Sequence, residues 1–107
     1  MLNQVVLVGR IVEGLEIKEL ENGKKVANIK IAIPRSWKNA EGEYETDFVP
    51  LNLYDNIASN TVEYCGKGDI VGVKGRIQVE ENNIQIIVEK LTFLSSKKTD
   101  EEEQKDS

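Results

Sequence analysis

Trp37, the only tryptophan of the chain, lies in a polar segment with Arg35 and Lys38 close on either side. It directly follows a strand whose residues alternate between apolar and polar types, so the ring is expected at the rim of a β-rich domain. A flat ring beside positive charge suits stacking on a nucleobase while the cations hold phosphates. The competing interpretation is that Trp37 packs back onto the sheet or fills a subunit contact.

The strand predicted over residues 46–54 carries the sharpest pattern. Its apolar residues alternate and are expected to face the core: Val49, Leu51 and Leu53. Because side chains of a strand alternate between faces, the opposite face should carry two rings and an amide: Phe48, Asn52 and Tyr54. Such a face is a stacking platform for bases, although the same surface could be a subunit interface or lie under a loop.

Cations follow the same alternation on neighbouring strands. In the strand predicted over residues 70–79, the inward set is Val71, Val73, Ile77 and Val79, and the outward set is Lys74, Arg76 and Gln78. Lys30 is outward on the strand over residues 25–33, and Arg10 is similar on the first strand. A single outward cation on a strand is usually a solvated side chain. Rings and cations that interleave along one groove favour a nucleic-acid strand instead.

Enzymatic function is not indicated. The chain has no histidine, so it lacks the imidazole that Ser–His and Cys–His catalysis and most zinc sites require. Cys65 falls on a predicted buried helical face. Carboxylates alternate at Glu41, Glu43, Glu45 and Asp47; they could bind Mg²⁺ but favour a solvated charged face. We therefore expect no catalytic residues, no metal and no cofactor.

Composition sets the remaining bounds. The chain has 107 residues and a net charge of −5, which argues against a protein held to nucleic acid by bulk charge but allows a local basic stripe. No apolar run is long enough to span a membrane and no leader is evident, so no membrane partner is expected. The single Cys65 excludes an internal disulfide and fits a reducing, cytoplasmic location.

The predicted elements follow in a recognisable order. Strands are expected at residues 4–12, with a continuation over 15–20, and at 25–33, 46–54, 70–79 and 84–94. Asn22-Gly23 predicts a hairpin turn, residues 35–45 a polar loop, and residues 81–83 a tight connection. Between the third and fourth strands, Ile57, Ala58, Val62 and Cys65 share a helical face, with Asp55 or Asn56 as N-cap and Gly66 as the stop.

This order predicts an all-β protein: a five-stranded OB-fold barrel with one short helix between strands 3 and 4. Residues 1–94 would form that domain. Residues 95–107 contain no apolar side chain and are expected to be a disordered acidic tail.

Several motifs, taken in order, resemble bacterial single-stranded DNA-binding proteins. They include Asn3–Arg10, Asn22-Gly23, Val26-Ala27-Asn28, Ser36-Trp37, Thr46-Asp47-Phe48, Leu53-Tyr54 and Lys67–Arg76. The resemblance implies an OB-fold that coats single-stranded DNA in replication, recombination and repair, as a homotetramer rather than a dimer, with possible replication or recombination proteins as partners. It implies base stacking at Trp37, Phe48 and Tyr54, and a cytoplasmic, nucleoid-associated location.

The predicted contact set joins both lines of reasoning. Stacking is assigned to Trp37, Phe48 and Tyr54, and phosphate or polar contacts to Arg10, Lys30, Arg35, Lys38, Asn52, Lys74 and Arg76. The chain departs from the family in a short connection at residues 80–83, in a tail without an apolar tip, and in Pro50, which predicts an edge position or a bulge in its strand. The acidic body and short connection favour an alternative, an OB-fold adaptor of a primosome or recombination complex that acts mainly through protein contacts.

Overall fold

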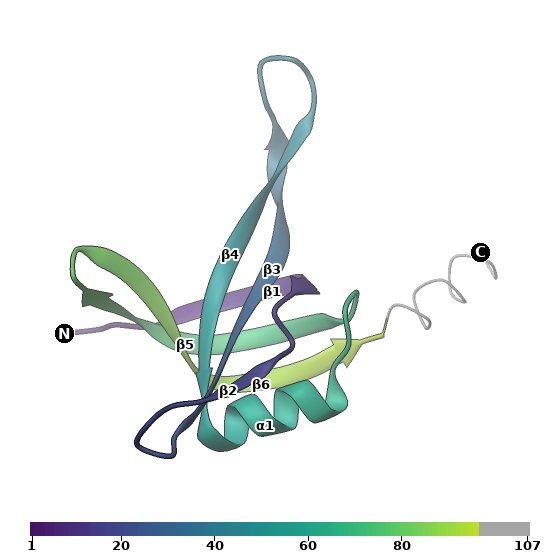
Figure 1. The fold of residues 1–107 in the computed structure, drawn as a ribbon. Coiled ribbons are helices and arrows are strands. Elements are labelled where there is room, and N and C mark those ends of the chain that lie inside the picture. Colours follow the sequence, from purple (N-terminus) through teal and green to yellow (C-terminus); the bar gives the residue numbers. More distant parts are fainter. Residues whose placement is uncertain (97–107) are drawn as a thin grey trace.

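Alternating apolar residues fold into six strands and one helix over residues 1–96, the part of the chain that the computed structural model describes (Figure 1). The elements are β1 (Val5–Glu13), β2 (Ile17–Glu19), β3 (Lys25–Lys38), β4 (Tyr44–Tyr54), α1 (Asp55–Tyr64), β5 (Ile70–Glu80) and β6 (Asn83–Ser95). Ser95, the first residue of the predicted acidic tail, still belongs to β6. Residues 97–107 of that tail lie outside the described residues. No helix in this described part is long and apolar enough to cross a bilayer.

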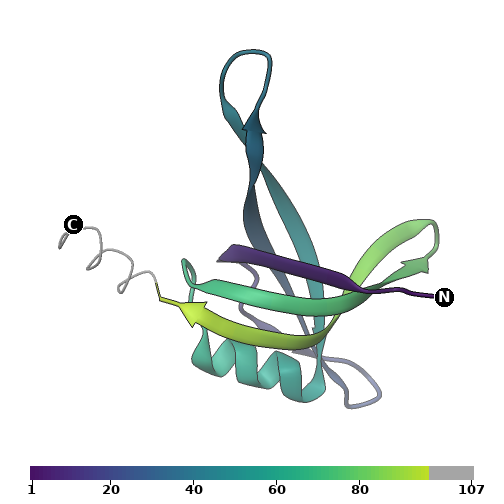
Figure 2. The same cartoon turned by 180° about the vertical axis from the view of Figure 1, so that it is seen from behind.

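The sheet closes because β1 pairs on both sides. The strand order is β1-β5-β6-β4-β3-β2, and β1 also pairs with β3. Arg10 marks the crossing point, since it lies opposite Ala32 of β3 and opposite Ile70 of β5. Figure 2 shows β1, β5 and β6 side by side from behind. Together with the helix between β4 and β5, this arrangement confirms the predicted OB-fold class.

β2, the strand added to the five that were predicted, is the expected continuation of the first predicted strand. β1 and β2 both pair with β3, and the chain bends between them at Gly14. Gly14 has a φ of +95°, and a Cβ at this position would collide with the carbonyl oxygen of Asn28. The bend therefore needs glycine, and it divides the predicted first strand into two short ladders on β3.

The core lies inside the closed part of the sheet. Its fully buried side chains come from four strands and the helix: Ile11, Ala27, Ile29, Ile31, Leu51, Leu53, Val71 and Ala58. The predicted inward face of β4 is confirmed, with Val49 packed against this core. For β5 the prediction is correct at Val71 and Val73.

The prediction is wrong for the far half of β5. Ile77 and Val79 are 41% and 62% exposed, because β5 and β6 extend as a hairpin beyond the closed sheet, where no opposite strand covers them. The predicted tight connection is present: Glu81 and Asn82, both at positive φ, form a two-residue turn between Glu80 and Asn83. The connection is short, but the strands themselves still form a projecting arm (Figure 1).

A second arm replaces the loop predicted over residues 35–45. β3 continues through Lys38 and β4 begins at Tyr44, so these strands rise away from the closed sheet as a long hairpin (Figure 1). Asn39 closes its tip, because its side-chain oxygen accepts the backbone N–H of Glu41 at 2.9 Å and of Glu43 at 3.0 Å. A side-chain turn of this type lets the ladder continue almost to the tip.

The helix has the predicted buried face but different ends. Ala58 is buried, and Ile57, Val62 and Cys65 are partly buried against the core. The N-cap is Tyr54, without a side-chain cap, and not Asp55 or Asn56. The Asp55 carboxylate instead accepts the backbone N–H of Lys25 at 3.4 Å. The helix ends at Tyr64, where the Cys65 N–H bonds the carbonyl of Thr61 at 2.9 Å; Gly66 follows outside it.

Gly75→Ala tests the closeness of β5 to β6. A Cβ at Gly75 would overlap the backbone carbonyl oxygen of Ile87, so the substitution should lower the free energy of unfolding by about 1–3 kcal/mol. Gly72→Ala is the matched control in the same strand, because its Cβ would meet only the Leu94 side chain, at 3.5 Å from Cδ1. Urea unfolding measures both variants, and equal stabilities would contradict this packing.

Candidate nucleic-acid interface

Cross-strand pairs fix the outward face of β3 and β4. Ala32 lies opposite Phe48, Asn28 opposite Asn52, and Val26 opposite Tyr54. Directly opposed residues share a face of the sheet, so Phe48, Asn52 and Tyr54 lie in line on β4, on the face away from the core. Phe48 is 59% exposed, whereas Asn52 and Tyr54 are half-buried.

Tyr44 adds a ring to this face that the sequence analysis missed. It belongs to β4, four residues before Phe48, and is therefore on the same face. Its ring is 60% exposed, and the Lys38 ammonium lies 5.7 Å from the ring centroid, a cation–π distance. The signal was present in the sequence, because the alternation of residues 46–54 extends backward by one more period to Tyr44.

Trp37 lies near the tip of the same arm. Pro34 is opposite Thr46 and Lys38 is opposite Tyr44, so β3 advances four residues while β4 advances two. The two extra residues form a bulge in β3, and Trp37 lies within it. Its side chain is 66% exposed, so it does not pack back onto the sheet of its own chain. Bulges bend a strand and redirect its side chains. Here the bulge in β3 exposes the ring of Trp37, the largest in the chain.

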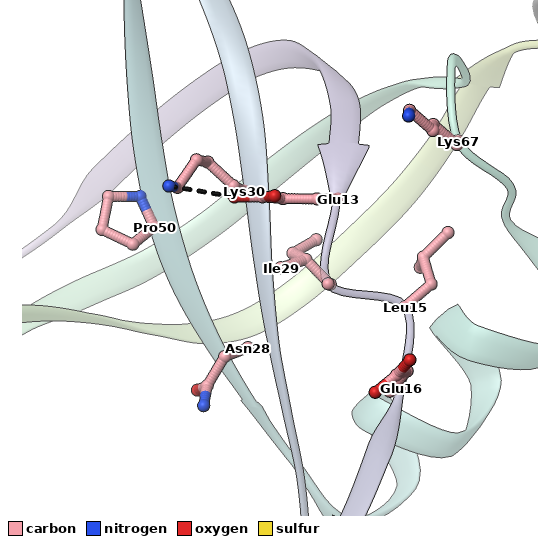
Figure 3. Close-up of a pocket in the computed structure, with 9 residues that line it drawn as sticks. Glu13, Leu15, Glu16, Asn28, Ile29, Lys30, Pro50 and Lys67 are labelled. Atoms are coloured by element: carbon pink, nitrogen blue, oxygen red, sulfur yellow. Dashed lines mark ion pairs between the residues drawn. The ribbon is translucent and has the colours of Figure 1, made fainter.

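Two further cations, besides Lys38, border the aromatic face. Arg10 on β1 is opposite Ala32, which is itself opposite Phe48, so a small alanine separates the arginine from the ring in one row across three strands. The Arg10 guanidinium donates to the Gly68 carbonyl at 2.7 Å, which holds the side chain in place. Lys30 lies two residues before Ala32 on β3 and therefore on the same face. Its ammonium forms an ion pair of 3.0 Å with Glu13 (Figure 3).

Pro50 lies opposite Lys30 on this face, in an unbroken stretch of the β3–β4 ladder. The other edge of β4 pairs with β6 only at Asn52 and Ile87. Pro50 therefore occupies an edge position, one of the two outcomes expected for a proline that cannot donate to a ladder.

Lys74 and Arg76 lie elsewhere. Both belong to β5, which is not a neighbour of β4 in the sheet. β6 lies between β5 and β4 on one side, and β1 and β3 lie between them on the other. Lys74 is exposed opposite Val6 of β1. Arg76 donates to the Gln78 side chain at 2.8 Å and lies 4.0 Å from the Glu89 carboxylate. The structure thus groups the rings with Arg10, Lys30 and Lys38, and leaves the β5 cations on a neighbouring surface.

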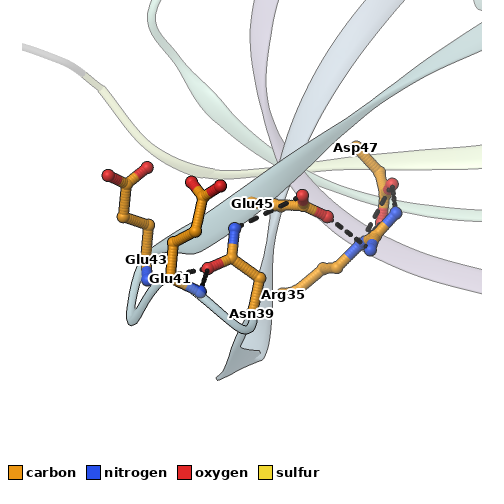
Figure 4. A network of polar contacts seen from close by, with 6 residues as sticks. All are labelled: Arg35, Asn39, Glu41, Glu43, Glu45 and Asp47. Carbon is orange, nitrogen blue, oxygen red and sulfur yellow. Dashed lines mark hydrogen bonds and ion pairs between the residues drawn. The ribbon is translucent and has the colours of Figure 1, made fainter.

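Arg35 lies on the opposite face of the arm and is held by acidic residues (Figure 4). Asp47 is opposite Ile33, whose row faces the core side, so it points away from the Phe48 face. The Arg35 guanidinium bonds the Asp47 carboxylate at 2.9 Å and the Glu45 carboxylate at 2.7 Å. These contacts raise the pKa of Arg35, chiefly through the hydrogen bond to Asp47, and the same bond lowers the pKa of Asp47.

The remaining carboxylates of this arm lie nearer its tip. The Asn39 amide lies 3.4 Å from the Glu45 carboxylate, and the side chains of Glu41 and Glu43 project from the tip (Figure 4). Within residues 1–96, no three histidine, cysteine or acidic side chains are grouped to hold a metal ion. The arm therefore has two chemically distinct faces, one aromatic and one acidic.

The Arg35–Asp47 pair predicts an acid titration. Because the folded-state pKa of Asp47 is lowered, its stabilising contribution is present above the ordinary carboxyl range and is lost as the pH falls through the lowered value. Arg35→Gln should therefore move the pKa of Asp47 up, toward about 3.9. Carbon-13 NMR of the Asp47 carboxyl measures this directly. An unchanged titration in Arg35→Gln would show that the pair does not persist in solution.

A closed coiled sheet and a helix between β4 and β5 define an OB-fold protein, and this one carries exposed rings on the outward face of β4. The model of the Single-strand binding protein family matches residues 2–94, and the chain belongs to that family. The resemblance read from the sequence motifs is thereby confirmed.

Named relatives agree with this family. The chain is 47% identical to single-stranded DNA-binding protein B of Bacillus subtilis (strain 168), over 73% of this chain and 69% of the relative. It is 35% identical to single-stranded DNA-binding protein 1 of Clostridium acetobutylicum, over 91% and 97% of the two chains. A crystal structure of a deletion mutant of the single-stranded DNA binding protein from Thermus aquaticus superposes with a TM-score of 0.70 at 18% identity. That match covers 88% of this chain and 51% of the other, and it supports the fold alone.

Proposed function

We propose that this protein binds single-stranded DNA with little sequence preference and protects it during replication, recombination and repair. The observation that carries the proposal is the row of rings on the outward face of β4, with Phe48 and Tyr44 about 60% exposed and not required by the core. The names of the relatives, all single-stranded DNA-binding proteins, favour this function over a protein adaptor. No catalytic activity is part of the proposal, and its site of action is the cytoplasm, at the nucleoid.

Stacking supplies most of the affinity in this mechanism. Tyr44 and Phe48 are four residues apart on β4, roughly 13 Å at about 3.3 Å per residue, so each ring contacts a different base. Trp37 adds a ring at the tip of the arm, and Tyr54 one at its base. Because every base has a π-face, such a surface tolerates any sequence.

Cations then hold the phosphates between stacked bases. Lys38, Lys30 and Arg10 border the aromatic face, and Asn52 offers an amide within it. Contacts at Lys74 and Arg76 require the strand to continue across β1 onto β5. A phosphate contact at Arg35 requires the phosphate to displace Glu45 or Asp47.

Phe48→Ala is the first test of this mechanism. Loss of one stacking ring should weaken oligo-dT binding by about 1–3 kcal/mol, roughly 5-fold to 150-fold in the dissociation constant. Quenching of Trp37 fluorescence on titration with oligo-dT measures the binding of the wild type and of the Phe48→Ala variant. The 59% exposure of Phe48 means that the fold should survive the change, which circular dichroism checks.

Tyr64→Ala is the matched control. Tyr64 is an aromatic residue of similar exposure, 72%, but it belongs to α1 and not to the arm. Its removal should leave the affinity unchanged. Equal losses in the two variants, or no binding by the wild type at low salt, would refute the proposal.

Self-association through β1 is a second part of the proposal. Val5 to Gly9 pair with β5 alone, so the other edge of this stretch has no partner strand within residues 1–96. Val6 and Val8 beside that edge are 70% and 54% exposed. An unpaired, apolar edge strand is a template for pairing with a second copy. We propose a homo-oligomer, with a tetramer rather than a dimer as the final state.

Val6→Glu should reduce the mass of the assembly. A carboxylate at this exposed position would place like charges opposite one another in a paired two-fold edge and weaken it. Light scattering with and without oligo-dT measures the mass, and Lys18→Gln on β2, also exposed, controls for the same change in net charge. A monomeric wild type, or an unchanged mass in Val6→Glu, would contradict an interface at β1.

A further inference from the structure

Two lysines lie directly opposite one another on the outer face of the sheet that β1, β5 and β6 form. Lys74 of β5 pairs with Lys90 of β6, and it also lies opposite Val6 of β1. Their neighbours Val73 and Leu91 pack against the core, so the alternation of each strand turns both lysines outward. Both are exposed, on strands that Figure 2 shows side by side.

No negative charge balances this pair of lysines. Like charges that lie directly opposite one another in an antiparallel pair destabilise the sheet. Among residues 1–96, neither ammonium has a carboxylate within ion-pair distance. Glu89, which adjoins Lys90 in the sequence, instead lies 4.0 Å from the guanidinium of Arg76. The two lysines therefore carry uncompensated positive charge in a chain whose net charge is −5.

A hollow of about 210 Å³ lies on this face beside the two lysines. Gly72 is part of its lining, in the next row of the sheet, opposite Val8 of β1 and Thr92 of β6. A Cβ at Gly72 would meet only the Leu94 side chain, so the glycine leaves the middle of the row open. Thr92, which is exposed, brings a hydroxyl to the side of the hollow where Lys90 lies.

The groups around the hollow match an oxyanion. The two ammonium groups and the Thr92 hydroxyl supply hydrogen-bond donors from three positions, whereas Val6 and Val8 line the opposite side with apolar surface. Lysine binds phosphate as a point charge, and a tetrahedral phosphate has enough oxygens to accept from all three groups. The apolar side excludes water there, so the attraction between the charges is less screened than in bulk solvent.

We propose that Lys74, Lys90 and Thr92 form a binding site for a phosphate-type oxyanion, either inorganic phosphate or the phosphodiester of a nucleic acid. The bound anion relieves the repulsion between the two ammonium groups and thereby stabilises the folded chain. The site is separate from the stacking rings, because β4 lies two strands away from β5 in the sheet. It needs none of the rings, so it can be tested independently of the proposed DNA binding.

Lys90→Gln tests the site in two buffers. In a low-salt chloride buffer, the variant should unfold at a higher temperature than the wild type, because the repulsion is removed. When phosphate replaces chloride at equal ionic strength and pH 7, the midpoint of the wild type should rise by about 2–8 °C, since a ligand of the folded state stabilises it. Lys90→Gln should gain much less. Circular dichroism of the full-length proteins, at one protein concentration, measures both shifts.

Lys24→Gln is the matched control. It removes an exposed lysine in the turn before β3, away from the hollow, and changes the net charge equally. It should not stabilise the protein in chloride, and it should gain as much from phosphate as the wild type does. If Lys90→Gln resembles Lys24→Gln in both buffers, inorganic phosphate is excluded as the ligand.

Oligo-dT titrations distinguish the two sources of phosphate. If DNA supplies the anion, Lys90→Gln should bind oligo-dT several-fold more weakly than the wild type, with a slope of log K against log salt that is lower by about 0.7. If inorganic phosphate supplies it, the midpoint shifts and the affinity for oligo-dT in chloride stays unchanged. No effect of Lys90→Gln in either assay would refute the site. Such a result would leave ring stacking intact, because Phe48→Ala measures stacking separately.

Discussion

Double pairing of β1 is the constraint from which the rest of this molecule follows. One strand of nine residues pairs with β5 along its first part and with β3 along its last part. A sheet closed over so few residues must be strongly coiled, and glycines permit the close approaches that this requires. Gly9 lies against the backbone of Ala32 and Gly75 against that of Ile87. Side chains at these positions would push the strands apart and open the sheet.

Closure also decides which parts of the sheet stay exposed. The closed section is shorter than β3, β4, β5 and β6, so the excess length of these strands leaves it as two hairpin arms (Figure 1). On an arm, neither face has a core to bury, and apolar side chains there remain in solvent, such as Ile77 and Tyr44. The exposure of Tyr44 and Trp37 is thus a direct consequence of strands that extend beyond the closed sheet. Phe48 is exposed for another reason, because it lies on the outer face of the closed part, in the row of Arg10 and Ala32.

Alternation in the sequence predicted the closed part well and the arms poorly. Leu51, Leu53, Val71 and Val73 were assigned to the core correctly, because a period of two fixes the face of every residue once a strand is identified. The same period placed Ile77 inside, since alternation says nothing about where the covering strand ends. The polar composition of residues 35–45 predicted a loop, but cross-strand pairing with β4 keeps Trp37 and Lys38 in a strand.

The candidate site was predictable only in part for a similar reason. Phe48, Asn52 and Tyr54 share a face because they share a strand, which a local pattern can show. Contacts between distant segments depend on register and on the bulge after Pro34, which no local pattern contains. The hydrogen bonds that Arg35 donates to Glu45 and Asp47 are contacts of this kind.

Charge distribution finally favours rings over cations as the main source of affinity. Lys30 is already paired with Glu13, Arg35 with Glu45 and Asp47, and Arg76 lies near Glu89. A phosphate that binds one of these cations replaces one anion by another, so its net Coulombic gain is smaller than at a free ammonium, and fewer counterions are released. Stacking does not replace one anion by another. A base that stacks on the exposed rings of Trp37, Tyr44 and Phe48 displaces only water. A chain with a net charge of −5 can therefore hold a polyanion, provided that its bases, rather than its phosphates, make the principal contacts.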